Sequence, residues 1–99
     1  MRSLYTWGGT YFGRHQGDSL FTVNGVEAGR FHGDEIYGSN GQYLGELKNG
    51  KLITSTLKGS RSRGGFIPSS HVGEVGYVGH VGSVMLVGYE DFPSPDSFR

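Results

Sequence analysis

Cysteine is absent from this chain of 99 residues, so disulfides and thiolate metal sites are excluded. Proline is scarce, with three residues, and hydrophobic residues make up 34% of the chain, below the usual share. No apolar run approaches the length that crosses a membrane. The first residues also lack the apolar core of a signal peptide. We therefore predict a cytoplasmic protein without a membrane span.

An excess of either charge is also missing, because nine basic residues balance nine acidic ones. A dedicated nucleic-acid binder normally carries a basic excess, so we predict no nucleic-acid partner. One alternative is a stacking platform, in which Tyr5, Phe21 and Tyr37 share a sheet face beside Arg14 and Arg30. A row of buried aromatic side chains is the simpler interpretation of that pattern.

Catalytic motifs are missing as well. The sequence contains no Gly-x-Ser-x-Gly, no phosphate-binding loop and no His-Glu-x-x-His. Its carboxylates lie mostly in turn-like dipeptides such as Gly17-Asp18, where local hydrogen bonding explains them. An enzyme is therefore unsupported, no catalytic residue is predicted, and no cofactor is expected.

Glycine, in contrast, is abundant, with 19 residues, and part of it belongs to a repeat of 16 residues. Residues 3–18 and 19–34 are identical at eight of 16 positions. Residues 35–50 diverge but keep the same register, and a fourth copy begins at residues 51–53. A fixed period of this kind predicts an architecture built from one repeated structural unit.

Each repeat contains two turn signals that divide it into short strands. The first is Gly8-Gly9 and its counterparts, which suit two-residue hairpin turns, and the second is Gly17-Asp18 and its counterparts. The spacing predicts an all-β fold, an antiparallel meander of short hairpins in a single domain spanning 1–99. The predicted strands are 3–7, 10–16, 19–23, 26–32, 35–39, 42–48 and 51–56.

Both faces of this predicted sheet are apolar. One phase of the strand alternation carries Leu4 and its counterparts, and the other carries Tyr5 and its counterparts. Such a sheet needs cover on both sides, from its own curling, from the C-terminal third of the chain or from other copies. Glycines recur in mid-strand at residues 13, 29 and 45, which indicates a repeated bend or a close backbone approach.

The second half of the chain has a different character. Residues 57–70 are predicted to form a solvated loop, whose Lys58, Arg61 and Arg63 offer an anion site as the alternative. In 71–88 valine recurs at every third residue and glycine often follows it. Two structures fit this segment, an extended polyproline-II-like segment with a glycine edge, or a strand with glycine bulges, which its valines favour. Residues 89–99 form a tail, in which Tyr89 and Phe92 are the expected anchors.

A period of three in 71–88 would place His71, Glu74 and His80 on one edge of that segment. A metal ion needs several convergent ligands, and one chain offers few. A symmetric ring of chains would supply several copies of His80. His71 and His80 are therefore weak metal-ligand candidates, and no metal is predicted.

Three segments of the chain are distinctive: GRFHGDEIY at 29–37, GQYLGEL at 41–47 and GYEDFP at 88–93. Together they resemble the four-fold β-flower family of small bacterial proteins. The resemblance covers most of 3–53 and the tail, whereas the valine–glycine triplets do not map onto it. It implies a homotetramer around a four-fold axis, with aromatic-lined hydrophobic sites for ligands and no characterised function. No catalytic residue carries over from it.

The first repeat is aromatic where the second is plain. Trp7 occupies the position of Val23 and Ser39, so the fold does not require a large residue there. Tyr11 and Phe12 likewise stand where the second repeat has glutamate and alanine. This contrast predicts a pocket for an extended apolar ligand, formed by Trp7, Tyr11, Phe12 and the nearby Tyr5. The alternative is extra packing at a subunit interface.

The sequence thus predicts a small oligomeric binding module with an aromatic-lined pocket for hydrophobic molecules. Its partners would be further copies of itself, as a homotetramer, and a hydrophobic small molecule. A purely structural homo-oligomer without a ligand is the main alternative. An enzyme acting on hydrophobic substrates is a more distant one.

Overall fold

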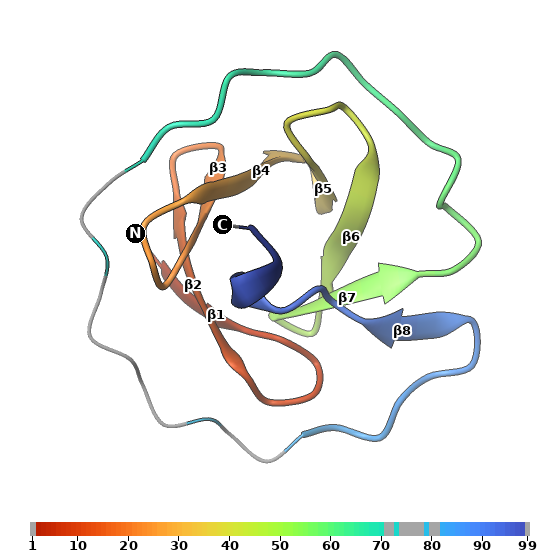
Figure 1. Ribbon diagram of the computed structural model, residues 1–99. Helices are drawn as coiled ribbons and strands as arrows, with labels where there is room; N and C mark the ends of the chain where they lie inside the picture. The colour runs from red at the N-terminus through yellow and green to blue at the C-terminus, as the bar shows by residue number, and fades with distance from the viewer. Residues whose placement is uncertain (1, 71–72, 74–78, 80–81, 99) are drawn as a thin grey trace.

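The structure, a computed structural model, describes residues 2–70, 73, 79 and 82–98. Eight strands form one curled antiparallel sheet in sequential order (Figure 1), which confirms the all-β meander. The strands are β1 (Arg2–Tyr5), β2 (Tyr11–Gln16), β3 (Ser19–Thr22), β4 (Glu27–His32), β5 (Glu35–Tyr37), β6 (Tyr43–Lys48), β7 (Lys51–Ser55) and β8 (Tyr89–Asp91). A short 3₁₀ helix, η1 (Pro95–Phe98), follows them. Among the described residues, no helix is long and apolar enough to cross a membrane.

The first seven strands end within two residues of the predicted boundaries. The turn dipeptides explain this agreement, because Gly17, Gly33 and Gly50 all adopt positive φ in the tight turns between hairpins. β8 was not predicted, since the tail was expected to contain only anchoring side chains. Its pairing with β7 ends at Asp91, two residues before Pro93, which cannot donate to a sheet ladder.

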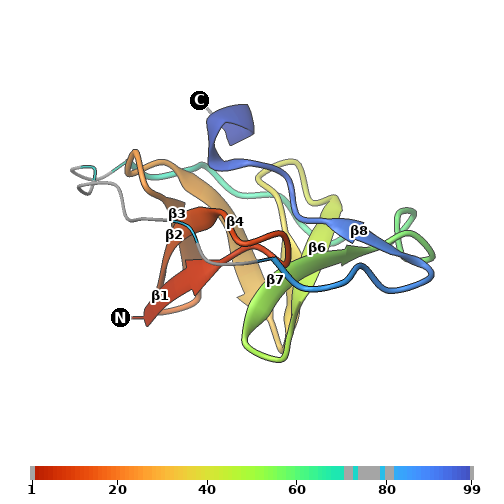
Figure 2. The ribbon, with the colours of Figure 1, turned by 90° about the horizontal axis from the view of Figure 1, so that it is seen from below.

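The sheet curls until its first and seventh strands meet. Thr6 forms a parallel bridge with Leu52, and the amide of Trp7 donates to the carbonyl of Leu52 at 2.8 Å. The amide of Gly8 donates to Asp91 Oδ1 at 3.1 Å, which attaches β8 to the first hairpin. Seen from the side, η1 projects from one end of the curled sheet and the β6–β7 turn lies at the other (Figure 2).

The mid-strand glycines allow neighbouring strands to approach closely where the sheet bends. A Cβ atom on Gly29 would lie 2.8 Å from the carbonyl oxygen of Tyr37, and one on Gly45 would lie 2.5 Å from that of Ile53. On Gly13 it would overlap the carbonyl oxygen of Phe21. Each of the three hairpins also has a register shift opposite the bend. These glycines therefore shape the sheet, as bulge glycines commonly do.

Aliphatic side chains from the odd-numbered strands form the centre of the core. They are at most 1% exposed: Leu4, Leu20, Ile36 and Leu52. Each even-numbered strand adds one residue to a second core layer. It is the residue that follows the strand partner of Tyr5, Phe21, Tyr37 or Ile53. In chain order this layer contains Phe12, Ala28, Leu44 and Phe92.

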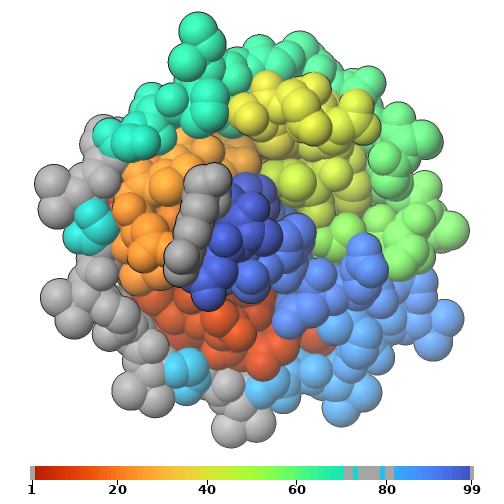
Figure 3. Space-filling model, in the orientation of Figure 1, coloured from red at the N-terminus to blue at the C-terminus, as the bar shows by residue number. Residues whose placement is uncertain are grey.

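The C-terminal segment covers this inner face. The ring of Phe12 lies 5.2 Å from that of Phe92 and 5.7 Å from that of Phe98, both edge to face. Figure 3 shows the C-terminal residues filling the middle of the molecule between the hairpins. The tail therefore supplies the cover that one apolar face requires.

The connection between β7 and β8 covers the outer side. We call its described residues, 57–70, 73, 79 and 82–88, the strap, which runs around the outside of the hairpins (Figure 1). The strap bonds to each hairpin in turn. Its Arg63 amide donates to Gly41 O at 2.7 Å, its Ser69 carbonyl accepts from the Glu27 amide at 2.9 Å, and its Ser83 amide donates to Trp7 O at 3.0 Å.

Glycines of the strap face the hairpin backbones. Cβ atoms on Gly73, Gly79 and Gly82 would lie 2.6–3.2 Å from carbonyl oxygens of the first two hairpins. The exposed side chains of Val84 and Val87 lie away from this contact. No described residue of 71–88 belongs to a strand, so the bulged-strand alternative is not met there. A segment with a glycine edge and a valine edge agrees with these positions, and the other residues of 71–88 lie outside the described part.

Candidate ligand-binding site

The structure brings two of the four predicted aromatic residues together and places a third on the opposite face of the sheet. Tyr5 and Tyr11 are brought together, with ring centroids 5.1 Å apart and edge to face. Phe12 is fully buried in the core cluster with Leu4, on the inner face. Because successive strand residues alternate between faces, Phe12 and Tyr11 are directed to opposite sides of β2.

Trp7 has a role within the chain that the sequence did not indicate. Its side chain is 5% exposed, and its Nε1 donates to the carbonyl of Val84 at 2.9 Å. The Trp7 carbonyl accepts from the Ser83 amide, and the ammonium of Lys51 lies 5.6 Å from the ring centroid. Lys51 also donates to the hydroxyl of Ser83. Trp7 therefore holds the end of the strap against the first hairpin.

A cavity of about 390 Å³ lies elsewhere, at the second hairpin. The second hairpin, the turn of the third hairpin, the strap and the C-terminal helix all contribute to it. Its described lining residues are Val26, Glu27, Ala28, Ser39, Pro68, Ser70 and Phe98. The four predicted aromatic residues are not among them. The space is large enough for a small organic molecule, since ligand sites begin at roughly 300 Å³.

The second core layer explains why the cavity lies here. Three of its four positions carry large side chains, Phe12, Leu44 and Phe92, whereas the second hairpin carries Ala28. An alanine methyl does not reach as far as the larger side chains. Because protein interiors are otherwise closely packed, the missing volume remains as a space. The aromatic first repeat thus fills its own volume, and the plain second repeat leaves room beside Phe98.

Glu27 is one of the lining residues, and its carboxylate is buried beside the cavity. Its side chain is 1% exposed, and its carboxylate accepts from three donors. Oε1 accepts from the Ser69 amide at 2.9 Å, and Oε2 accepts from the Ser19 hydroxyl at 2.5 Å and from Arg30 Nε at 3.0 Å. Burial acts to raise the pKa of Glu27, but the bonds from Arg30, Ser19 and Ser69 outweigh it and lower the pKa. The carboxylate is therefore ionised at neutral pH.

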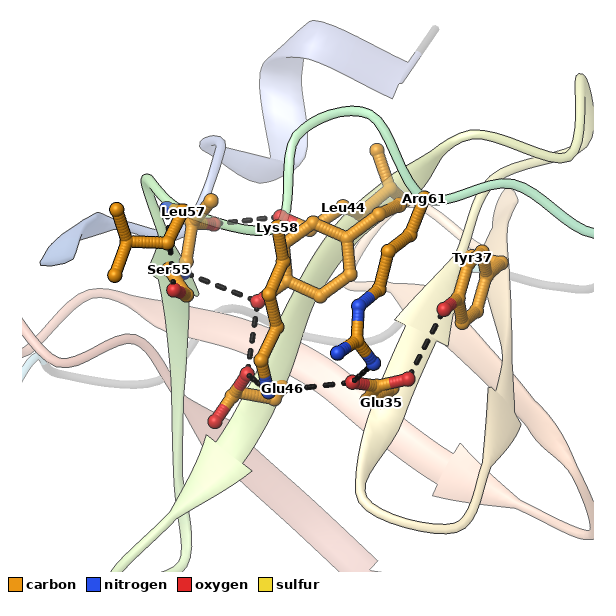
Figure 4. Close-up of polar contacts among 10 residues, drawn as sticks. Glu35, Tyr37, Leu44, Glu46, Ser55, Leu57, Lys58 and Arg61 are labelled. Carbon is orange, nitrogen blue, oxygen red and sulfur yellow. Dashed lines mark hydrogen bonds and ion pairs between the residues drawn. The ribbon is translucent and has the colours of Figure 1, made fainter. Parts of the chain in front are cut away.

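A second polar cluster fixes the start of the strap (Figure 4). Glu35 and Glu46 are paired across β5 and β6, and Lys58 lies between them, 3.2 Å from the first carboxylate and 2.7 Å from the second. Arg61 forms a second ion pair with Glu35 at 2.8 Å. The Tyr43 hydroxyl donates to Glu46 at 2.9 Å. Since both cations are paired with carboxylates, this cluster anchors the strap, and the anion-site alternative loses two of its three charges.

The pKa shifts in this cluster follow from its pairing. The bond to Glu46 raises the pKa of Lys58 against the opposing effect of burial. Burial acts to raise the pKa of Glu35, but its hydrogen bonds from Tyr37 and Lys58 outweigh burial, so the pKa of Glu35 is lowered. Burial, and then the neighbouring Glu46 carboxylate, raise the pKa of Tyr43 to about 12. These shifts favour the charged forms of the ion pairs and the neutral form of the phenol.

The weak metal candidates stay untested, because His71 and His80 lie outside the described residues. Of the other two histidines, His15 stacks on Phe31 with centroids 3.9 Å apart, and His32 lies edge to face with Tyr37. Within the described part of the chain, no group of three or more histidine and carboxylate side chains is placed to hold a metal ion.

Comparison with known proteins adds no relative. No family model matches the chain, and no curated protein or solved structure is significantly similar to it. The resemblance to the four-fold β-flower family, and the homotetramer that it implies, therefore stay predictions. The geometry of the chain itself must support any functional conclusion.

Proposed function

We propose that this protein is a non-enzymatic binding module, which holds a small, mainly apolar molecule in the cavity beside Ala28. The observation that supports this is the concave space bounded by apolar groups of Val26, Pro68 and Phe98, with a few polar groups at its wall. Small-molecule sites commonly combine an apolar lining with a small number of fixed polar groups. The hydrophobic ligand of the sequence-based prediction keeps its class, while the proposed site moves from the first hairpin to the second.

The predicted aromatic residues support this site through their neighbours. Phe12 packs against Phe98, which lines the cavity. Trp7 holds one end of the strap, and Pro68 and Ser70 of the same strap line the cavity. Substitution of Trp7 by alanine is therefore expected to weaken ligand binding indirectly.

We also propose that copies of the chain assemble through the outer side of the strap. Large apolar side chains there are almost fully exposed in the single chain: Leu57, Ile67, Val84 and Val87. Val84 and Val87 are close together in the chain at the end of the strap, and a contiguous exposed apolar patch marks an interaction surface. The family resemblance suggests four copies. A purely structural oligomer without a ligand is the alternative, and ligand binding separates the two.

The binding proposal is tested by filling the cavity. Ala28→Leu places in the second hairpin the residue that Leu44 already provides in the third, so the fold should accept it. We expect the fluorescent probe 1-aminoanthracene to bind the native protein and to bind Ala28→Leu at least about tenfold more weakly, because the added side chain removes the space. Leu44→Met changes the same core layer outside the cavity lining and should keep native affinity. Equal affinity of the native and Ala28→Leu proteins would contradict the proposal.

The assembly proposal is tested by native mass spectrometry. The native chain should be an oligomer, and Val87→Glu should reduce it to monomers, since the charge would be buried without a partner. Gly59→Ala lies on the same strap in open space and should leave the oligomer intact. A native monomer at micromolar concentration would contradict the assembly proposal and leave the binding proposal unaffected.

A further inference from the structure

The core layer that contains Ala28 carries an aromatic ring at two of its other positions. The strand registers place Phe12 and Phe92 at the positions that correspond to Ala28. All three residues belong to one buried cluster, and each is at most 3% exposed. The second hairpin therefore repeats the strand register of the first at this point but lacks its ring.

Phe98 brings a third ring to this layer. Its ring lies edge to face with that of Phe12, with centroids 5.7 Å apart, and it stacks with that of Phe92 at 6.5 Å. The helix η1 lies beside β4, inside the circle of hairpins (Figure 1), and Phe98 lines the cavity together with Ala28. Phe98 thus packs against aromatic rings at two positions of the layer and borders an open space at a third.

A space of this origin favours a molecule that resembles the missing side chain. Apolar cavities left where a large side chain is absent can bind benzene. Two aromatic rings that pack edge to face or offset also attract each other through their electron distribution, in addition to burying apolar surface. A saturated ring of the same size gains the burial alone. The cavity, at about 390 Å³, is larger than one ring, so the ring can carry a substituent toward Pro68 and Ser70 of the strap.

Resting on the proposed function, we propose that the ligand of this cavity carries an aromatic ring of the size of a phenyl group. The ring takes the place beside Ala28 that the Phe12 ring fills in the first hairpin, and it packs against the ring of Phe98. The site consequently selects aromatic over saturated apolar molecules. Burial of apolar surface alone would not produce this selection.

Two alcohols of similar size test this selection on the full-length native protein. Benzyl alcohol has the aromatic ring, and cyclohexylmethanol has a saturated ring in its place. Affinities are measured by titration, with the amide and methyl chemical shifts as the signal. We expect benzyl alcohol to bind about fivefold more tightly, because an aromatic pair is stabilised beyond its buried area. Its ring current should also shift the Ala28 methyl resonance strongly, whereas the saturated probe has no ring current.

The possible outcomes separate this inference from the function on which it rests. Equal affinity for the two alcohols, or tighter binding of cyclohexylmethanol, would overturn the aromatic selection and leave an apolar binding site standing. Failure of both alcohols to perturb Ala28, Ser39 and Ser70 up to their solubility limits would contradict the binding function as well.

A variant at Phe98 tests which ring the ligand contacts. Phe98→Leu keeps an apolar side chain at the cavity but removes the aromatic contact, so the preference for benzyl alcohol should fall by about fivefold. Phe66→Leu is the matched control, because the ring of Phe66 lies against the Arg30 guanidinium and is not among the described lining residues. The control should keep the native preference. An unchanged preference in Phe98→Leu would refute the role of Phe98.

A variant that supplies the ring covalently keeps the test decisive if Phe98→Leu does not fold. Ala28→Phe places a phenyl ring at the position that corresponds to Phe12. We expect its midpoint of thermal unfolding to rise by about 4 °C, and both alcohols to lose their binding, because the new ring occupies the cavity. A midpoint below that of the native protein would show that the space does not accept a ring and would overturn the inference.

Discussion

Removal of the Trp7 side chain should release the end of the strap. Trp7 is 5% exposed, and truncation of a buried Phe or Trp to alanine costs about 3–5 kcal/mol. A chain of 99 residues is expected to have roughly 5–15 kcal/mol of total stability. Trp7→Ala should therefore remove a large share of the free energy of unfolding.

The matched variant Trp7→Phe separates burial from hydrogen bonding. It retains an aromatic ring over which Lys51 can lie, but it loses the Nε1 bond to the Val84 carbonyl. Val84 is exposed, so water can replace that donor and the loss should be only about 0.5–1.5 kcal/mol. The two variants should thus differ by a few kcal/mol.

Urea denaturation measures these free energies, and hydrogen exchange of the Ser83 amide measures the strap contact locally. That amide donates to the Trp7 carbonyl, so Trp7→Phe should preserve its protection and Trp7→Ala should lose it. A Trp7→Ala protein within about 0.5 kcal/mol of native stability, with unchanged Ser83 exchange, would refute the anchoring role.

Further consequences concern the bend glycines and the ionic cluster. Gly45→Ala should destabilise the fold by about 1–3 kcal/mol in thermal unfolding, because its Cβ would lie 2.5 Å from a carbonyl oxygen, whereas Gly59→Ala, in open space, should be nearly neutral. The lowered pKa of Glu35 stabilises the fold above the unfolded-state pKa, and this stability disappears as the pH falls through the folded-state pKa. Lys58→Met removes part of the cause and should therefore reduce the stability lost on acidification. Unfolding at several pH values checks this, and an unaltered acid profile would count against the pairing. Between pH 10 and about 12 the Tyr43 phenol ionises in the unfolded chain but stays neutral in the fold, so the native protein should lose stability as the pH rises. Tyr43→Phe should lose less.

The strands could be predicted because local chemistry determines them. The turn dipeptides require positive φ or tolerate it, and they recur at a fixed spacing, so the strands between them follow. The need to cover two apolar faces was also visible in the alternation of Leu4 and Tyr5. Which segment covers which face depends on long-range packing, and residues 57–98 lie outside the 16-residue repeat that determines the hairpins.

The cavity illustrates a different limit. The contrast between Phe12 and Ala28 was visible in the sequence, and it does mark the region of interest. The sequence predicts a pocket at the aromatic side of that contrast; in the fold Phe12 is buried in the core, and the cavity that we describe lies at the alanine side. Pro68 and Phe98 complete the cavity from distant parts of the chain, and no local pattern places them there.

β8 escaped prediction for a related reason. Residues 89–91 are too short to show alternation, and they pair with β7 across the whole length of the strap. In each hairpin a short turn in the sequence predicts where the returning strand begins, but here 33 residues separate Ser55 from Tyr89. The register and the ring contact with Phe12 show that Phe92 joins the same core layer.

The most direct test of the binding site is an isotope-filtered NOE experiment on the native protein with unlabelled indole. Contacts between the indole protons and both the Ala28 methyl group and the Phe98 ring are the predicted result. Contacts confined to exposed side chains such as Val87, or no contacts at a saturating indole concentration, would contradict the claim that the cavity at the second hairpin binds a ligand.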